Sequence, residues 1–409
     1  MLVLIYKNNL DHLLMRNFTF KGLFLAAMFM VLGSLAIQAA DNDGLITKQI
    51  IVKLEKAGTL PDRIGSTKRN KITNLKIIGE INGTDWRVIR EMAGRSYYND
   101  GTDGKLAILD LSEAKIVSGG GSYLYDDSYT NDNELGSCAF LNCSGLTSLS
   151  LPSSLTSIER EAFAGCSGLT SLSLPSSLTS IKYRAFYGCS GLTSLSLPSS
   201  LTSIKYRAFY GCSGLTSLSL PSGITSIDWN AFSGCSGLTS LTLPSSLTSI
   251  DSGAFSGCSG LTSLTLPSSL TSIDSGAFSG CSGLTSLSLP SGLTSIGDGA
   301  FRGCSGLTSI YVYTEKLPNM GSDVFDGCDA KKCTVYVPKG TYDDYWLSEF
   351  GYFENIVEFD PTGINNVITS NDAKELSRYS VNGQRLSAPT KGLNIVKYSD
   401  GSVKKVAVQ

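Results

Sequence analysis

The chain of 409 residues contains one histidine, His12, which precedes a long apolar run near the N-terminus. Histidine is the usual base that activates a serine or cysteine nucleophile, and it is a common nitrogen ligand of zinc. If the N-terminal segment is removed on export, the remaining chain has no imidazole. The sequence therefore predicts that the protein performs no Ser–His or Cys–His catalysis. It also predicts no metal site and no cofactor.

The eleven cysteines are the next candidates for chemistry. Eight of them recur at one constant spacing along the chain: Cys143, Cys166, Cys189, Cys212, Cys235, Cys258, Cys281 and Cys304. Equivalent side chains on stacked strands point the same way, so their Cβ atoms stay about 4.8 Å apart, against about 3.8 Å in a disulfide. We expect buried free thiols along this ladder. The Cys138–Cys143 and Cys328–Cys333 pairs are candidate bridges, and a zinc site there is disfavoured because its ligands would have to come from both ends of the repeats.

Paired carboxylates are the remaining route to catalysis, as in glycan hydrolases. The acidic residues of the repeats occur one per unit along a ridge, so this alternative is the least favoured. The acidic loops at 100–104 and 126–134 do not match a calcium loop, and we interpret them as solvated. Serine or threonine recurs at position 150 and at the equivalent position of each later unit, and such a row could bind sugar or ice. A solvated sheet face is polar in any case.

Bulky and basic side chains concentrate at the variable positions of the early repeats. Tyr, Trp and Arg are the residue types that dominate binding hot spots. The candidate partner-binding residues are Lys182, Tyr183, Arg184, Tyr187, Lys205, Tyr206, Arg207, Tyr210 and Trp229. The alternative is an ordinary loop surface multiplied by the copying of one repeat.

These residues are positioned by a single repeating unit, whose copies are nearly perfect over 143–303. In its first copy, Leu149 and Leu151 alternate with serines, which predicts a strand with its leucines pointing inward. Pro152 ends the strand because it has no N–H to donate. The Ala162–Phe163 pair is predicted to lie on a short helical or 3₁₀ turn. One unit cannot bury its apolar groups alone, so the units must stack into a column.

The predicted fold class is a leucine-rich-repeat solenoid, mostly β with short helical or 3₁₀ turns, capping regions and a small C-terminal β unit. Two hairpin signals, Asn382-Gly383 and Asp400-Gly401, predict the antiparallel β unit. The predicted organisation is a signal peptide at 1–40, an irregular N-terminal cap at 41–142, a solenoid at 143–337, a C-terminal cap at 338–360, and a linker with a β tail at 361–409.

The unit LTSLxLPSSLTSI followed by AFxGC resembles the BspA-type leucine-rich repeat family over about residues 143–358. The stretch from EINGTDWRVIREMAG to KLAILDLSEAKIVSGG resembles the N-terminal cap of its members. The resemblance implies a surface or secreted protein of a Gram-negative gut or oral bacterium, associated with adhesion to host matrix proteins and to other bacteria, without a catalytic motif. The segment 379–409 is similar to the C-terminal sorting tails of such proteins, but shorter than a full type IX sorting domain.

The N-terminus has the order of a secretory signal. Arg16 and Lys21 precede the apolar run 22–39, which ends at Ala39-Ala40. Met15 is an alternative start, and a permanent membrane helix is the alternative interpretation of the run.

The formal charge of −2 gives no basic excess for nucleic acid. We expect a non-enzymatic secreted or cell-surface adhesion protein. Its partner would be an extracellular protein or glycan, host matrix included, with no nucleic acid and no membrane segment after signal cleavage. The alternative is a structural surface-coat protein without a specific ligand.

Overall fold

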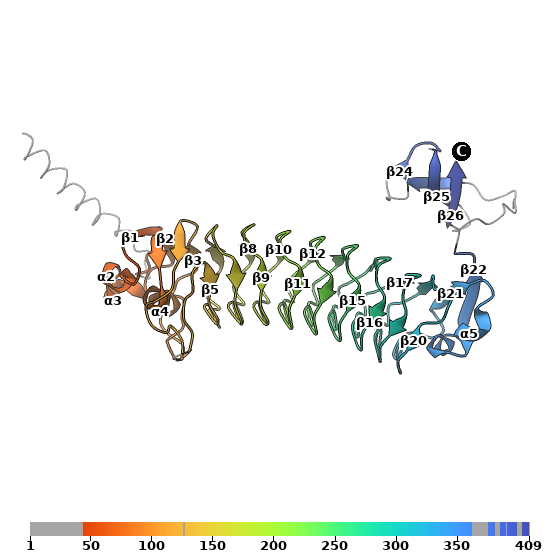
Figure 1. Cartoon of the computed structure of the whole chain (residues 1–409), viewed down its shortest axis with the longest axis horizontal. Coiled ribbons are helices and arrows are strands. Elements are labelled where there is room, and N and C mark those ends of the chain that lie inside the picture. The colour runs from red at the N-terminus through yellow and green to blue at the C-terminus, as the bar shows by residue number, and fades with distance from the viewer. Residues whose placement is uncertain are drawn as a thin grey trace, which may run out of the picture. The chain divides into compact units, whose positions relative to one another are not determined.

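The protein is described from a computed structural model (Figure 1). The structure describes residues 44–125, 127–361, 375–380, 385–389, 391–398 and 403–408. The predicted signal peptide therefore lies outside the described residues. The chain divides into two compact units, Met1–Pro221 and Ser222–Gln409. Both contain the same repeated turn, and the fold is a repeat solenoid, as the sequence predicts. The domain boundaries given above remain predictions.

Each regular turn contributes a longer and a shorter strand to two separate parallel sheets. In the turn that begins at Cys166, these are β8 (Ser171–Ser173) and β9 (Ser180–Ile181). Leu172 is buried while the serines on either side of it are exposed, as strand alternation requires. The apolar side chains inside the column therefore come from every turn.

The first unit contains two parallel sheets. The larger follows the order β1-β2-β3-β6-β8-β10, with β4 also paired to β2, and the smaller follows β5-β7-β9. Neighbouring strands of the regular turns pair at equivalent positions of the repeat, so Leu149 lies beside Leu172 and Leu172 beside Leu195. The strands of this unit are β1 (Ile50–Leu54), β2 (Asn74–Ile81), β3 (Ile108–Asp110), β4 (Ala114–Ile116), β5 (Glu134–Leu135), β6 (Ser148–Ser150), β7 (Ser157–Ile158), β8, β9, β10 (Ser194–Ser196), β11 (Ser203–Ile204) and β12 (Ser217–Ser219).

The second unit repeats this arrangement with its own strands. One sheet contains β13-β15-β16-β18-β20 and another β17-β19-β21-β22, all parallel. The strands are β13 (Ser226–Ile227), β14 (Ser240–Thr242), β15 (Ser249–Ile250), β16 (Ser272–Ile273), β17 (Ser286–Leu289), β18 (Ser295–Ile296), β19 (Ser309–Val312), β20 (Asn319–Met320), β21 (Thr334–Pro338) and β22 (Asn355–Phe359).

A column of stacked phenylalanine rings runs through each unit. In the first unit, Phe163 and Phe186 are fully buried and their ring centroids are 5.0 Å apart at an interplanar angle of 14°. In the second, Phe255 and Phe278 stack at 5.4 Å and 7°. Burying such a ring contributes about 1.5–3 kcal/mol per turn, so stability accumulates with each added turn.

The corner that carries the Ala-Phe pair is a series of turns, not a helix. Ala162 N donates to Glu159 O and Ala164 N to Glu161 O, which are i→i+3 bonds, but no helix forms. Glu161 has a positive φ of 55°, which prevents the bonds from continuing as a 3₁₀-helix. The predicted short turn at 162–163 is therefore present as separate i→i+3 turns, which do not join into a helix.

All eleven cysteines are free and buried. The two candidate bridges, Cys138–Cys143 and Cys328–Cys333, are therefore not formed. Six thiols of the ladder donate to a phenylalanine carbonyl 26 residues earlier, with sulfur–oxygen distances from 3.0 Å at Cys166 to 3.4 Å at Cys258: Cys166, Cys189, Cys212, Cys258, Cys281 and Cys304. The first thiol, Cys143, donates to Leu141 O at 3.9 Å instead. The expectation of free packed thiols is confirmed.

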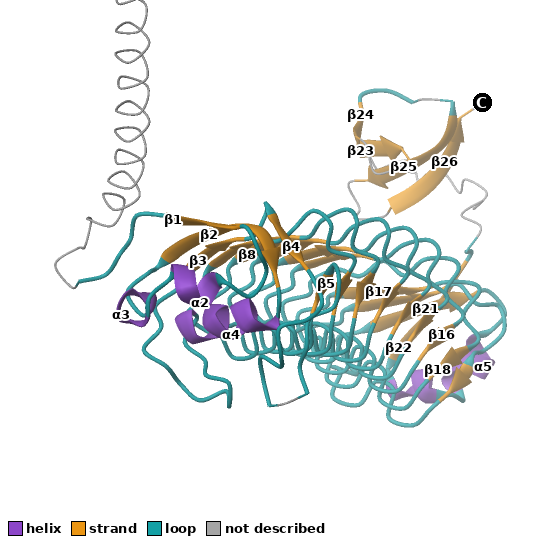
Figure 2. Cartoon of the chain, turned by 60° about the vertical axis from the view of Figure 1, so that its left-hand side comes forward, coloured by secondary structure: helices purple, strands orange, loops and turns teal. Residues whose placement is uncertain are grey.

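Helices occur only in the capping segments of the described chain (Figure 2). They are α2 (Leu60–Arg63), α3 (Ser66–Arg69), α4 (Gly83–Met92), α5 (Tyr342–Trp346) and the 3₁₀-helix η1 (Glu349–Tyr352). Helix α4 begins with a capping box between Asn82 and Asp85. Arg90 on α4 is fully buried and donates to the carbonyls of Cys138 at 2.7 Å and Ala139 at 3.1 Å, which ties the cap to the first turn. None of the described helices is long and apolar enough to cross a bilayer.

The C-terminal segment forms a separate antiparallel sheet of order β24-β23-β25-β26. Its strands are β23 (Glu375–Ser380), β24 (Arg385–Leu386), β25 (Gly392–Tyr398) and β26 (Val403–Val408). The predicted small β unit is confirmed. The two Asn-Gly and Asp-Gly turn pairs themselves lie outside the described residues.

Candidate binding surface

The variable positions follow the shorter strand of each turn and form the corner of the solenoid. Backbone hydrogen bonds fix this corner in both directions: Lys182 N donates to Ile158 O of the turn before, and Arg184 N donates to Tyr206 O of the turn after. The side chains at these positions therefore repeat as rows, one strand spacing apart. We call Lys182, Tyr183, Arg184, Tyr187, Lys205, Tyr206, Arg207 and Tyr210 the Arg–Tyr patch.

Guanidinium groups and tyrosine rings alternate across this patch. The carbon at the centre of the Arg184 guanidinium is 5.8 Å from the ring centroid of Tyr187 and 5.9 Å from that of Tyr206. Arg207 lies 5.0 Å from Tyr206 and 5.3 Å from Tyr210. Contacts within about 6 Å are in the range of cation–π attraction. The patch is therefore one connected network of side chains.

The tyrosines remain available to solvent. Tyr183 is 42% exposed and Tyr187 36%, while Tyr206 and Tyr210 are half-buried. The rings of Tyr187 and Tyr210 stack at 5.0 Å and 4°. Stacking holds these rings in fixed orientations, so binding would order few rotamers.

Charge on the patch is mainly positive. Arg184 forms an ion pair with Glu161 at 3.1 Å, and this hydrogen bond raises the pKa of Arg184. The Tyr183 hydroxyl accepts a hydrogen bond from Arg160 at 3.4 Å, which raises the pKa of the arginine. The lysines add further positive charge at the first variable position of both turns. The arrangement favours an anionic partner.

Trp229 belongs to the second unit and is described separately. It is 55% exposed and lies between Asp228 and Asn230 at the same variable positions of its own turn. A large exposed indole on a short corner has the residue type of a binding contact. Its role as a binding contact remains a prediction.

The third variable position is left-handed in every regular turn, which the sequence analysis missed. Its φ is 55° at Glu161, 54° at Arg184 and 52° at Arg207, but three later turns have glycine there. Left-handed backbone costs a residue with a Cβ about 1–2 kcal/mol. The glycines Gly253, Gly276 and Gly299 were the signal that could have revealed this position.

Exposed tyrosines on the N-terminal cap were also missed. Tyr98, Tyr125 and Tyr129 are 66%, 48% and 54% exposed. Tyr129 lies inside the acidic segment 126–134, and Tyr98 and Tyr125 lie just before the two acidic segments interpreted as solvated. Their signal was present in the stretches SYYND and SYLYDDSYTND, where tyrosine recurs among small polar residues.

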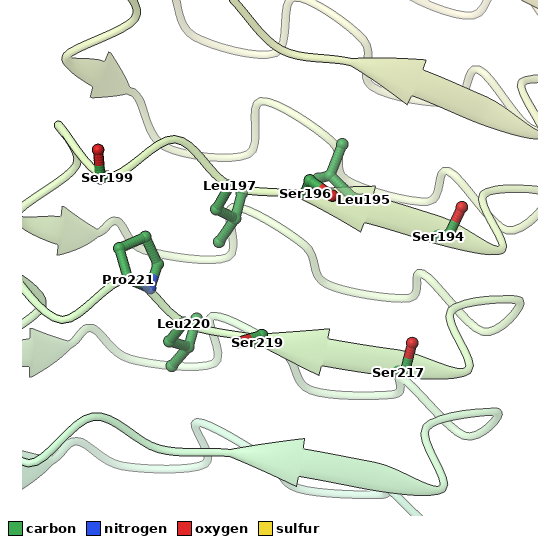
Figure 3. A pocket seen from close by; sticks show the side chains of 9 residues that line it. All are labelled: Ser194, Leu195, Ser196, Leu197, Ser199, Ser217, Ser219, Leu220 and Pro221. Carbon is green, nitrogen blue, oxygen red and sulfur yellow. The ribbon is translucent and has the colours of Figure 1, made fainter. Parts of the chain in front are cut away.

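The serine face of the first unit holds a shallow pocket of ≈ 400 Å³ (Figure 3). Serines of β10 and β12 line it, and Leu197, Leu220 and Pro221 close one side. Its lining contains neither a carboxylate nor any other charged side chain. The pocket therefore offers hydroxyl groups and apolar contact, but not an acid–base pair.

A row of aspartates occupies the first variable position in the second unit. Burial raises the pKa of Asp251, and the neighbouring Asp228 and Asp274 raise it further. Across the described residues, no group of three or more His, Cys, Asp or Glu side chains is arranged to hold a metal ion.

Comparison with known proteins identifies the repeat. The sequence model of the BspA type leucine rich repeat region matches residues 133–249 and 227–343, with six copies. A search of curated protein sequences found no match.

Several solved structures are similar in fold. A leucine-rich repeat protein of T. pallidum is 36% identical, covers 39% of this chain and 76% of its own, and has a TM-score of 0.36. A leucine-rich cell surface protein of Faecalibacterium prausnitzii is 22% identical over 70% of this chain and 79% of its own, with a TM-score of 0.30. The pneumococcal vaccine antigen PcpA is 18% identical over 79% of this chain and 82% of its own, with a TM-score of 0.41.

Proposed function

Because this chain belongs to the BspA-type leucine-rich repeat family, we propose that it is a non-enzymatic, secreted or cell-surface protein that binds an extracellular protein or glycan. The binding site is the Arg–Tyr patch, with Trp229 as an additional contact. The apolar run at 22–39 supports export, and family membership supports a surface protein.

The observation that carries this proposal is the left-handed backbone at Arg184 and Arg207. Three later turns have glycine at this left-handed position, so an arginine there lowers the free energy of unfolding relative to glycine. Residues kept in strained conformations tend to occur at functional sites.

The chemistry of the patch favours an anionic partner. Tyrosine rings supply rigid contact area, and arginine edges can donate paired hydrogen bonds to carboxylate or sulfate groups. Basic rows also speed association with acidic partners. An acidic region of a host matrix protein or an acidic glycan has the required charge.

Two other functions are less well supported. A structural coat protein would need no exposed Arg–Tyr network, and would bind no ligand in a salt-dependent way. A carboxylate-based glycan hydrolase would need converging acids, and the pocket on the serine face has none in its lining.

The test is binding of the mature protein to immobilised matrix proteins and acidic glycans at low and high salt. Replacing Tyr183, Tyr206 and Trp229 by serine should weaken capture about tenfold or more, as expected for hot-spot aromatics. Asp251→Ser with Asp274→Ser is the matched control, since these residues occupy variable positions in later turns. Equal binding by the triple variant and the wild type, with both folded, would remove the patch from consideration.

A further inference from the structure

Two loops of the N-terminal cap present tyrosines outside the Arg–Tyr patch. One loop, residues 95–104, carries Tyr98, and the other, residues 118–133, carries Tyr125 and Tyr129. These three rings are among the most exposed large side chains of the first unit, at 66%, 48% and 54%. The proposed function does not use them.

Direct contacts join the two loops into one surface. The Tyr125 hydroxyl donates to Tyr98 O at 3.1 Å, and Tyr125 N donates to Tyr97 O at 3.4 Å. Arg87 on α4 packs over the Tyr97 ring at 4.2 Å and donates to Ser122 O at 2.9 Å, so one side chain holds both loops.

Each loop is also fixed internally. Ser96 Oγ accepts hydrogen bonds from Tyr98 N at 3.1 Å and Asp100 N at 3.0 Å. In the second loop, Tyr123 is fully buried and its hydroxyl donates to Ser137 O at 2.7 Å. Ser118 N donates to Asp132 at 2.7 Å, which closes the base of that loop. The exposed tyrosines therefore stand on a preorganised backbone.

The composition of the two loops is that of a protein-recognition surface. Tyrosine, serine, glycine and asparagine are the residues enriched in antibody binding loops, where tyrosine gives large rigid contact area and the small residues adapt hydrogen bonds. All four residue types occur in both cap loops. Preorganisation reduces the entropy lost when such loops bind.

The exposed charge on these loops is acidic. Asp100, Asp127 and Asp132 are exposed on the loops. Arg87 on α4 is exposed as well, but its guanidinium donates to Ser122 O, and the half-buried Arg95 donates to Asn142 O. The hydrogen bond from Ser118 lowers the pKa of Asp132, so this carboxylate stays ionised at neutral pH. A partner that meets this surface needs a complementary basic region.

We propose that loops 95–104 and 118–133 form a second binding surface, which recognises a folded extracellular protein through a basic epitope. Its tyrosines make the central contacts and its aspartates select the charge of the partner. This site is separate from the Arg–Tyr patch, which favours the opposite charge.

The experiment compares variants of the full mature chain by surface binding to laminin, fibronectin, collagen and heparin. Changing Tyr98, Tyr125 and Tyr129 together to serine should lower affinity for at least one of the proteins about tenfold or more. Tyr342→Ser with Trp346→Ser, a similar change at exposed aromatic residues outside both surfaces, is the matched control and should leave that binding unchanged. Asp100→Lys with Asp127→Lys should weaken the same binding without removing an aromatic ring.

Three results would overturn the proposal. They are no binding of any of the three proteins by the wild type, binding of heparin alone, and equal protein binding by the wild type and both loop variants. Loss of binding in the patch variant, with Tyr183, Tyr206 and Trp229 changed to serine, but not in the loop variants would support the patch and refute the loop surface, so the two proposals fail separately. Melting curves of all variants check that they fold, and Tyr125→Phe, which removes only the hydroxyl that donates to Tyr98 O, separates the loss of this loop contact from the loss of the rings.

Discussion

The thiol of Cys189 donates a hydrogen bond to the carbonyl oxygen of Phe163, at 3.1 Å, across a buried step from one turn to the one before it. The same relationship joins Cys212 to Phe186 at 3.2 Å and Cys281 to Phe255 at 3.3 Å. A thiolate cannot donate this bond, and it would be buried without a counter-charge. The ladder therefore holds its sulfurs in the protonated form.

Alkaline pH should unfold the protein by ionising its buried cysteines. Burial raises the pKa of Cys143 to about 11, of Cys328 to about 11 and of Cys333 to about 12, from 9.0. The unfolded thiols lose their protons first, so stability is complete below pH 9 and falls as the pH rises toward 11. Each thiol contributes up to about 1.4 kcal/mol per pH unit.

The measurement is circular dichroism with a thiol probe between pH 8 and 11. Native protein at pH 8 should react slowly, and denatured protein should react at least at the seven ladder cysteines from Cys166 to Cys304. Thiols that stay blocked in denaturant without reductant would mean that the ladder is oxidised, contrary to this structure.

Removal of one whole turn should leave the solenoid folded. Segments 235–257 and 258–280 are identical, so deletion of either gives one and the same chain. The remaining turns keep their register, and the free energy of unfolding should fall only by the contribution of one turn. Deletion of half a turn, residues 235–246, misaligns every apolar row after it. Comparable melting of the two deletion variants would contradict the stacked-turn description.

Gly276→Ala should destabilise the protein by about 1 kcal/mol. The glycine has a φ of 61°, and a new Cβ would lie 3.9 Å from the nearest atom, Ser279 Cβ. Space is therefore available, and the loss would come from the left-handed backbone alone. Ser275→Ala in the same turn is the control, with an expected change within about 0.5 kcal/mol. Urea unfolding of both variants checks this, and a neutral Gly276→Ala would show that the position tolerates a side chain freely.

Asp251→Asn should stabilise the protein slightly at neutral pH. Burial, Asp228 and Asp274 raise the pKa of Asp251, so its charged form is disfavoured in the folded state. A raised carboxyl pKa gives stability that is present at low pH and lost as the pH rises through the folded value. Because Asp251 is partly exposed, the gain at pH 7 should be a few tenths of a kcal/mol and should vanish near pH 3. A gain that persists at pH 3 would point to a cause other than charge.

Export predicts a defined N-terminus. The junction Ala39-Ala40 should be cleaved, and mass spectrometry of protein recovered from the cell surface or medium should find Asp41 or a neighbour as the first residue. Mature protein that retains residues 1–40 would contradict secretion by this signal and would favour the membrane-anchored alternative.

The regular turns were predictable because one period fixes every apolar row. Leu149 and Leu172 had to face inward by alternation, and the stacking of Phe163 on Phe186 follows from the same register. The corner was not predictable as a helix or turn from the Ala-Phe pair alone. Its conformation depends on the left-handed residue two positions before Phe163, whose type varies from Glu to Arg to Gly.

The candidate binding residues were likewise predictable in part only. The rows of Tyr183 and Tyr206 followed from the repeat, but the contacts of Arg184 with both neighbouring rings depend on side-chain directions that no spacing rule supplies. The cap loops were harder, because Tyr98 and Tyr125 are 27 residues apart and meet only through non-repeating structure. Loop composition was the available signal, and the acidic residues obscured it.

The thiol–carbonyl ladder also bears on how the chain must fold. If the chain is exported as proposed, its eleven thiols could be oxidised at random before folding, and any cross-link between turns would prevent stacking. Yet six ladder cysteines have their acceptor 26 residues earlier, a separation near one repeat, and chains dominated by short-range contacts fold quickly. Folding can advance turn by turn, with each new turn enclosing the sulfur beneath it. Fast folding would then protect the cysteines chemically, because a thiol that is buried before an oxidant reaches it stays reduced.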